Sequence, residues 1–572
     1  MASLAPAYVP RRPTETVLHQ LVRQNLEPFL AYARANYDGG MLLYVEQEFR
    51  AYIRCGDFSQ GFSRARCDAC GHDLLVAFSC HGRSVCPSCC SRRMANVAAH
   101  LVDRVLPDVP VRQYVLTLPY ELRKLAAFKA DVLTALARIF VEAVFTMYGS
   151  RARRDRLEDI QCGAVNFVQR FGSLNLHVHF HLLLLDGVYA RDAQGRLVFH
   201  PAEAPTAADL QAIVARTARR SVVWLRKHGY LDDSPLEARS NETPAQTALD
   251  ACAAIAMGRG KVASVPHDGA QDEAHCDTDE GPDKPALAVE RDGFNVHAGV
   301  RIEAGDDFGR ERLARYGARP PLSLERLRRL AGGRVTYRLK YVDRGRRGKH
   351  RLMTGIEFMA RLAAIIAPPR YPLVRFAGVL APRSAWRREV VPQPRERRHA
   401  CEAARVDAQA PANGGNRAET KAPKSRGRDE CVPVPRPPSS TPHAQSAPAN
   451  DVPISAALAH PPAQSGDVNR LAPNVIAVNH WDRLLGGLLY AAQPRVDWAT
   501  LLRRSFSVDV LECPKCHGRL RMIAVITERE AARRILTHLG LPTEPPPIAR
   551  ARDPTEEDID DEVAAQLDLG LA

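Results

Sequence analysis

The sequence predicts an α+β fold built on a central antiparallel sheet with flanking helices. Residues 174–185 alternate polar and apolar side chains and then run into leucines, as is typical of a strand buried on both faces. Further strand patterns lie at residues 111–118, 163–171 and 294–302, separated by glycine turns or by helical segments. The order strand, helix, strand, strand favours an antiparallel sheet with residues 174–185 in its interior and helices on one face.

The central strand carries three histidines at alternate positions, His177, His179 and His181. Alternate residues of a strand share one face, so the three imidazoles should point the same way. Because an unsatisfied buried polar group costs about 1–3 kcal/mol, three buried imidazoles predict a divalent metal as their common partner. Mg²⁺ prefers oxygen ligands and Mn²⁺ tolerates nitrogen, and either ion could polarise a phosphodiester oxygen.

Cysteines are concentrated before this sheet, with seven of the 14 inside residues 55–90. Two CxxC pairs, Cys67 with Cys70 and Cys86 with Cys89, predict one four-cysteine zinc site. The remaining cysteines of the module could form a second site together with His81, or they could be buried thiols; they are Cys55, Cys80 and Cys90.

A third CxxC pair, Cys513 with Cys516, lies near the end of the chain. One pair supplies only half of a tetrahedral zinc site. His517, His538 or a second chain could supply the other half.

Composition divides the chain into segments. We expect an N-terminal helical segment at residues 1–50, a zinc-binding domain at 51–95 and the sheet domain at 96–390 with an irregular insertion at 235–290. The stretch after it is rich in proline, alanine, serine and charge, which predicts a disordered linker. The expected C-terminal segments are the linker at 391–472, a small domain at 473–545 and an acidic tail at 546–572.

The chain has a formal net charge of +14, which favours a polyanionic partner, nucleic acid first. A basic surface without such a partner is the alternative. No stretch is apolar enough for a transmembrane helix and no apolar signal opens the sequence, so we expect no membrane partner. Without export, the cysteines are expected to be thiols or metal ligands rather than disulfides.

A tyrosine downstream of the histidine strand is the candidate nucleophile. Residues 309–318 predict a short helix ended by Pro320 and Pro321, with Tyr316 in its last turn. A single tyrosine usually packs or lies on the surface, but this one lies among four arginines that would bind a scissile phosphate. These are Arg310, Arg312, Arg315 and Arg319, and Arg92 and Arg93 of the cysteine module are further candidates for phosphate contact. Attack by the phenol on phosphorus would give a covalent phosphotyrosine and a free 3′-hydroxyl.

These motifs together resemble the rolling-circle transposases of the "insertion sequence 91" family, which belong to the HUH endonucleases. The resemblance covers residues 50–390 in three stretches that occur in this order. They are the cysteine module running into Arg92-Arg93-Met94, the stretch from Gln169 to Val188, and the stretch from Phe294 through Tyr316 to Pro382.

The resemblance implies an HUH fold with His179 and His181 as the metal-binding pair, His177 as an extra histidine and Tyr316 as the nucleophile. Some relatives carry a second tyrosine four residues earlier, where this chain has Arg312, so the chain is similar to single-tyrosine members. The fold usually adds a third metal ligand, for which Gln169 is the candidate, with a sheet-surface glutamine as the alternative.

The function implied is a transposase that nicks single-stranded DNA at element ends and transfers the strand to target DNA. Its cofactors would be Mg²⁺ or Mn²⁺ at the histidines and Zn²⁺ at the cysteine module, and its place the cytoplasm of a bacterium, associated with the nucleoid. A plasmid-type rolling-circle replication initiator uses the same chemistry and is one alternative. The other is a non-catalytic zinc-dependent DNA-binding protein, in which the histidines are structural and Tyr316 packs.

Overall fold

A computed structural model describes residues 12–231, 247–258, 287–339, 350–392, 498–506 and 509–550. The chain divides into two units, one of Met1–Pro394 with Trp481–Ala572 and one of Arg395–His480, and all described residues belong to the first. The predicted linker beyond Pro392, the C-terminal residues 473–497, most of the predicted insertion and the acidic tail from residue 551 lie outside the described residues.

Among the described residues, six strands form the central sheet, in which every neighbouring pair is antiparallel. The strand order is β13-β4-β5-β3-β9-β8. The histidine strand β5 pairs with β3 on one side and β4 on the other, so its predicted interior position is confirmed. The strands are β3 (Val111–Thr117), β4 (Gly163–Gly172), β5 (Asn175–Leu185), β8 (Ala288–Arg291), β9 (Phe294–Ile302) and β13 (Val374–Gly378).

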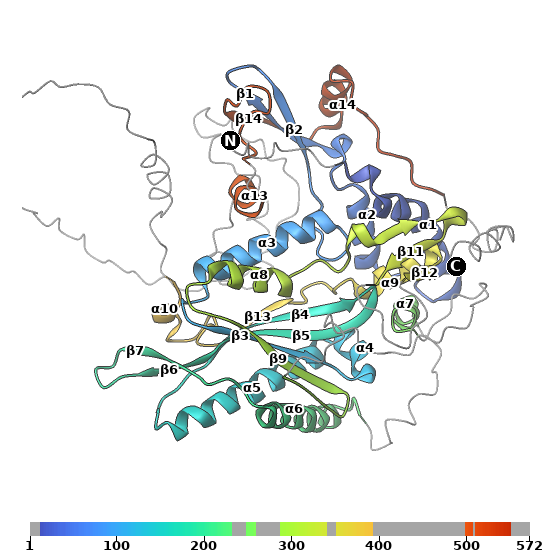
Figure 1. Ribbon diagram of the computed structural model, residues 1–572. Helices are drawn as coiled ribbons and strands as arrows, with labels where there is room; N and C mark the ends of the chain where they lie inside the picture. Colours follow the sequence, from blue (N-terminus) through green and yellow to red (C-terminus); the bar gives the residue numbers. More distant parts are fainter. Residues whose placement is uncertain are drawn as a thin grey trace, which may run out of the picture. The chain divides into compact units, whose positions relative to one another are not determined.

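Helices cover both faces of this sheet, so the expectation of helices on one face is wrong (Figure 1). Phe180 and Leu182 of β5 belong to the large core beneath α5 (Ala130–Arg154) and α6 (Ala207–Lys227). Leu183 and Leu185 point the other way, into a second core with α3 (Pro87–Arg104) and α8 (Asp307–Gly317). A leucine run in a period-two strand places apolar side chains on both faces, and each face then requires a covering layer.

Helix α8 has clear start and stop signals. Asp306 is its N-cap, and its carboxylate accepts the backbone N–H of Gly309 at 2.7 Å. The helix ends at Gly317, and Pro320-Pro321 follow. These two signals place Tyr316 in the last helical turn, as predicted.

The N-terminal region combines two helices, α1 (Val17–Asn36) and α2 (Leu43–Ile53), with the hairpin β1 (Phe62–Cys67) and β2 (Asp73–Ala77). The strand β14 (Leu520–Ile526) from the C-terminal region pairs with β1 and completes a three-stranded sheet. The zinc-binding and C-terminal domains, predicted as separate, therefore share one sheet. Two C-terminal helices flank β14 in the chain, α13 (Trp498–Phe506) and α14 (Arg529–His538).

The remaining elements surround this framework. A hairpin that turns at residues 192–195 is formed by β6 (Gly187–Arg191) and β7 (Leu197–Pro201). Part of the insertion expected to be irregular is helix α7 (Ala248–Ala256), whose N-cap Thr247 accepts the N–H of Asp250. The others are α4 (Tyr120–Phe128), α9 (Gly355–Ile365), α10 (Arg387–Val390), β10 (Leu327–Arg329), β11 (Val335–Arg338) and β12 (His350–Met353). No helix among the described residues is long and apolar enough to cross a membrane.

Candidate active site

The three strand histidines form a buried row. Their ring centroids are 4.8 Å apart between His177 and His179 and 4.9 Å apart between His179 and His181. Burial lowers the pKa of His177 and of His181 well below 6.5, and the neighbouring positive groups lower it further. Both rings are therefore neutral near pH 7, which is the state in which an imidazole can bind a metal.

Ring nitrogens of this row that have no protein partner could serve as metal ligands. Nε2 of His181 and both ring nitrogens of His177 are buried and have no hydrogen-bond partner within the described part of the chain. Nδ1 of His179 lies 3.0 Å from the carbonyl oxygen of His177; as a donor to that oxygen, it leaves the lone pair of this ring on Nε2. Nδ1 of His181 lies 2.6 Å from the side-chain amide of Gln113, which fixes the orientation of the ring.

Tyr316 meets this row across the space between helix α8 and the sheet. Its ring is perpendicular to that of His181, with the two centroids 5.3 Å apart. The guanidinium of Arg319 lies 4.8 Å from the centroid of the tyrosine ring and 5.6 Å from that of Phe171. The structure thus brings together the histidines, the tyrosine and one of the arginines singled out in the sequence.

Gln169 holds the end of helix α8 against the sheet. Its side-chain Nε2 donates to the carbonyl oxygens of Tyr316 at 2.8 Å and Gly317 at 3.0 Å, and its Oε1 accepts from Arg319 at 3.2 Å. A Cβ on Gly317 would come within 2.7 Å of the ring of Phe167, so glycine is needed for this close approach. These contacts make Gln169 a positioning residue, and its service as a metal ligand stays a prediction.

The arginines around Tyr316 are not equivalent. Arg310 is buried and bridges Asp108 and Asp307, so the expectation that it binds phosphate is wrong. Arg315 pairs with Glu311 at 2.6 Å. Arg312 is exposed on the helix, and its role in DNA binding, like that of Arg315 and Arg319, stays a prediction.

Basic side chains form part of the lining of a mostly apolar cleft next to the tyrosine. Arg83 and Arg93 from the cysteine module and Arg319 from the segment after α8 line it, and no described carboxylate does. Arg93 lies in the first turns of α3 with Arg92, and both are half-buried. A basic wall without acidic partners is suited to a phosphate backbone.

Arg170, at the bottom of this cleft, serves the fold. It is fully buried and donates to the carbonyl oxygens of Ala127, at the end of α4, and of Ala364, Ile365 and Ile366, at the end of α9. A cation at two helix C-termini complements both helix dipoles.

A second buried network ties the end of the histidine strand to its neighbours. Asp186 is completely buried and pairs with Arg112 of β3 at 2.9 Å and with Arg301 of β9 at 2.8 Å. Tyr148 of α5 donates to the same carboxylate at 2.6 Å. The cluster fixes β5 relative to two strands and one helix.

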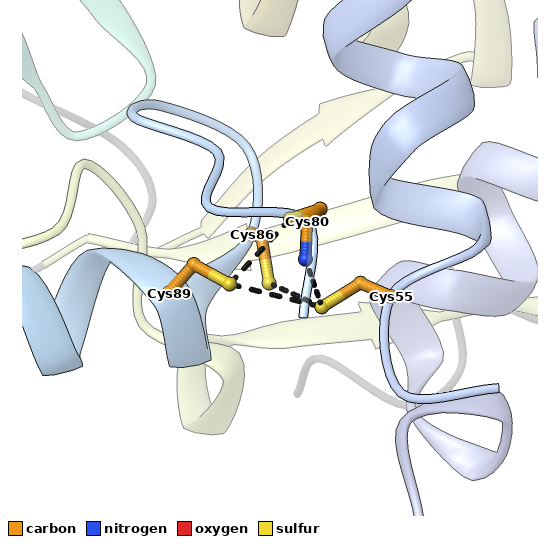
Figure 2. A group of neighbouring side chains, drawn as sticks. All are labelled: Cys55, Cys80, Cys86 and Cys89. Carbon is orange, nitrogen blue, oxygen red and sulfur yellow. Dashed lines mark hydrogen bonds between the residues drawn. The ribbon is translucent and has the colours of Figure 1, made fainter. Parts of the chain in front are cut away.

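The cysteines of the N-terminal module fall into two groups, which corrects the predicted partners. Cys86 and Cys89 gather with Cys55 and Cys80 (Figure 2). Cys67 and Cys70 gather instead with Cys513 and Cys516. The single site of Cys67, Cys70, Cys86 and Cys89 is therefore wrong, because β1 and β2 separate the first CxxC turn from the second. Cys90 belongs to neither group.

Both groups have the dimensions of a four-thiolate zinc site. In the first, Sγ–Sγ distances are 3.7 Å for Cys55–Cys89 and 3.5 Å for Cys80–Cys89. A tetrahedron with Zn–S bonds of about 2.3 Å has edges of about 3.8 Å, whereas a disulfide is about 2.05 Å long. The backbone N–H of Cys80 also donates to Sγ of Cys55 at 3.3 Å. The sulfurs are thus arranged for zinc and not for disulfides.

Sequence reasoning missed two residues that organise these sites. One Glu48 carboxylate oxygen accepts the backbone N–H groups of Arg83, Ser84 and Val85, at 2.9 to 3.3 Å, and so shapes the loop before Cys86. Nothing in the sequence marks Glu48. Gln113 could have been singled out in the sequence, because it is a polar residue on the strand predicted at 111–118. In the structure its side chain contacts His181.

Comparison with known proteins finds transposases. Residues 163–388 match a family described as "Putative transposase", and residues 24–118 match one described as "Transposase zinc-binding domain". The transposase for insertion sequence element IS801 of Pseudomonas savastanoi pv. phaseolicola is 24% identical over 390 residues, which cover 67% of this chain and 79% of the relative. No solved structure matches the chain.

Proposed function

Because the chain belongs to the insertion sequence 91 family of transposases, whose partner is DNA, we propose that it cleaves one DNA strand through Tyr316 and transfers that strand. The substrate is single-stranded DNA at the ends of the mobile element. The observation that carries the proposal is the perpendicular contact between the rings of Tyr316 and His181, at 5.3 Å between centroids.

The reaction is a transesterification at phosphorus. The phenol oxygen of Tyr316 attacks the scissile phosphate and loses its proton, and the bond from phosphorus to the 3′-oxygen breaks. The leaving oxygen takes up a proton, so one fragment ends in a 3′-hydroxyl and the other is joined to Tyr316 through its 5′-phosphate. A 3′-hydroxyl of another strand reverses the step and restores the tyrosine, with no net loss of phosphodiester bonds.

Three groups of this chain position the reactants. Gln169 holds the carbonyl oxygens of Tyr316 and Gly317, which sets the place of the phenol relative to the histidines. Arg319 lies over the phenol ring and supplies positive charge where a phosphate would come. Mg²⁺ or Mn²⁺ held by His179 and His181, with His177 beside them, would act as a Lewis acid on a phosphate oxygen.

The basic cleft gives the strand a path to the tyrosine. Arg83, Arg93 and Arg319 line it between the cysteine module and the end of α8. Phosphate contacts of this kind fix the register of a strand, and they bind without regard to sequence.

The test is formation of a covalent adduct. The purified protein is incubated with end-labelled single-stranded DNA from the element termini and Mn²⁺ or Mg²⁺, and denaturing electrophoresis separates protein-linked from free DNA. We expect an adduct with the wild type, none with Tyr316→Phe, and none with His179→Ala and His181→Ala combined.

Tyr337→Phe is the matched control, because Tyr337 is a buried tyrosine on β11 and does not belong to helix α8. It should retain the adduct. An adduct with Tyr316→Phe overturns the assignment of the nucleophile. A wild-type protein that binds the correct ends but never forms an adduct indicates a non-catalytic DNA-binding protein.

A further inference from the structure

The second cysteine group is built from the two ends of the chain. Cys67 ends strand β1 and Cys70 follows it. Cys513 and Cys516 precede strand β14, which pairs with β1 over six residues from Phe62–Ile526 to Cys67–Leu520. The two pairs meet although Cys67 and Cys516 are 449 positions apart. The family matches end at residue 388 and leave the C-terminal pair without a role.

The two CxxC turns have the same backbone form. The N–H of Gly71 donates to the carbonyl of Cys67 at 3.0 Å, and the N–H of His517 donates to that of Cys513 at 2.9 Å. Gly71 and His517 both have a positive φ, at 70° and 58°. Two matching turns that face each other present four sulfurs to one point, as in a zinc ribbon.

The four sulfurs lie close together between the two turns, and a side chain at Gly518 would crowd them. Sγ–Sγ distances are 3.5 Å for Cys67–Cys516 and 3.6 Å for Cys70–Cys513, close to the edge of about 3.8 Å expected for four thiolates on zinc. A Cβ at Gly518 would lie 3.2 Å from Sγ of Cys67 and 3.3 Å from Sγ of Cys516. Only glycine leaves these sulfurs uncrowded.

Apolar packing at this small sheet is slight. One face buries Ala65, Leu74 and Leu520 around Cys67 and Cys513, and the other buries Phe62, Leu75, Ala532 and Leu536. Modules of this size usually need a metal or disulfides to stay folded. The attachment of the C-terminal segment therefore depends on what the four cysteines bind.

The same segment braces the helix that carries the candidate nucleophile. Arg504 of α13 pairs with Asp103 of α3 at 2.7 Å and with Glu311 of α8 at 2.6 Å. Glu311 also forms an ion pair with Arg315, the residue before Tyr316. Leu501 of α13 packs on Ala95 and Ala99 of α3.

We propose that Cys67, Cys70, Cys513 and Cys516 bind a structural zinc ion that clasps the two ends of the chain together and holds α13 against α3 and α8. The clasp is formed within one chain. This proposal goes beyond the proposed DNA cleavage. It is tested by the zinc content of the protein and by amide hydrogen exchange, whether or not the protein forms a DNA adduct.

Zinc content tests the site directly. The full-length protein, purified without chelator, should contain two zinc ions per chain by elemental analysis. The double variants Cys67→Ser with Cys70→Ser and Cys513→Ser with Cys516→Ser should each retain one, because the group around Cys55 is intact. Cys90→Ser is the matched control and should retain two. A wild type with one zinc, or a Cys513/Cys516 variant that keeps two, overturns the proposal.

Hydrogen exchange separates a clasp within one chain from a site shared between chains. Replacing Cys67 and Cys70 should speed amide exchange in residues 498–506 and 520–526, far along the sequence, while β5 stays protected. The protein should behave in the same way at concentrations at which it is monomeric. Unchanged exchange in the C-terminal segment, or zinc loss on dilution of the wild type to monomer, contradicts the proposal.

Discussion

Replacing Gln169 by leucine removes the hydrogen bonds that hold the end of α8 to the sheet. The amide donates to the carbonyl oxygens of Tyr316 and Gly317, and each such bond contributes about 1 kcal/mol net. The carbonyl oxygen of Gly317, left without this donor beside the sheet, adds a desolvation cost of about 1–3 kcal/mol, whereas that of Tyr316 still accepts the backbone N–H of Arg319. Leucine has a similar volume, so a cavity contributes little. We therefore expect the free energy of unfolding to fall by about 3–5 kcal/mol.

The effect on the reaction should exceed the effect on metal binding. Tyr316 would no longer be fixed relative to the histidines, and a displacement of about 1 Å can cost about 100-fold in rate. We expect adduct formation to slow by about 10- to 100-fold, while the affinity for Mn²⁺, measured by titration with paramagnetic resonance detection, changes by no more than about twofold.

A metal-ligand role for Gln169 makes the opposite prediction. If its Oε1 binds the ion, Gln169→Leu should lower the Mn²⁺ affinity by about tenfold or more, and Gln169→Glu should restore it. That pair of results would refute the positioning role inferred from the hydrogen bonds. Slow adduct formation with both variants at unchanged Mn²⁺ affinity would support it.

Four other predictions follow from the described contacts. Asp186→Asn should lower the free energy of unfolding by about 3–5 kcal/mol in a denaturant titration, because it leaves the buried Arg112 without a countercharge; an effect under 1 kcal/mol contradicts this. Burial and the nearby Arg387 lower the pKa of His100 in the folded protein to about 4. The unfolded chain therefore takes up a proton at His100 at higher pH than the folded protein does, so the free energy of unfolding should fall by at most about 3 kcal/mol between pH 6.5 and pH 4. His100→Gln should reduce this dependence of stability on pH, and an unchanged dependence would contradict the low pKa of His100. Since His177 is beside the metal-binding pair, His177→Ala should reduce adduct formation less than His181→Ala, and the reverse order would make His177 a main ligand. A strong chelator should lower the melting temperature of the wild type by more than that of the Cys513→Ser and Cys516→Ser variant, which has one zinc fewer to lose; equal shifts would argue against a second zinc.

The part of the fold that could be predicted was the part with local periodicity. The alternation through His177, His179 and His181 gave the strand and the shared face, and the leucine run gave its interior position. The prediction of helices on one face of the sheet was wrong, because Leu182 and Leu183 of the same run lie in different cores and both faces are covered by helices. The position of Tyr316 in the last turn followed from the two prolines after the helix.

The partners within the sites could not be read from spacing. Two CxxC pairs 15 residues apart predict a common metal. Pairing of strand β1 with β14 instead places Cys67 and Cys70 beside the CxxC pair near the end of the chain. Such pairing depends on contacts between segments that no local pattern relates. Likewise, Arg310 belongs to the same arginine-rich segment as Arg319, yet the turn of the helix directs it into the protein, where Asp108 pairs with it.

The most direct measurement of the central claim is the site at which DNA becomes attached. Trypsin cuts after Arg315 and after Arg326 but not between Arg319 and Pro320, so it releases residues 316–326, a peptide with Tyr316 as its single tyrosine. Digestion of the adduct with nuclease and trypsin, followed by mass spectrometry, should find the residual 5′-nucleotide on this peptide. A nucleotide on a peptide that contains another tyrosine, or on a serine or histidine, would contradict the assignment of Tyr316 as the nucleophile.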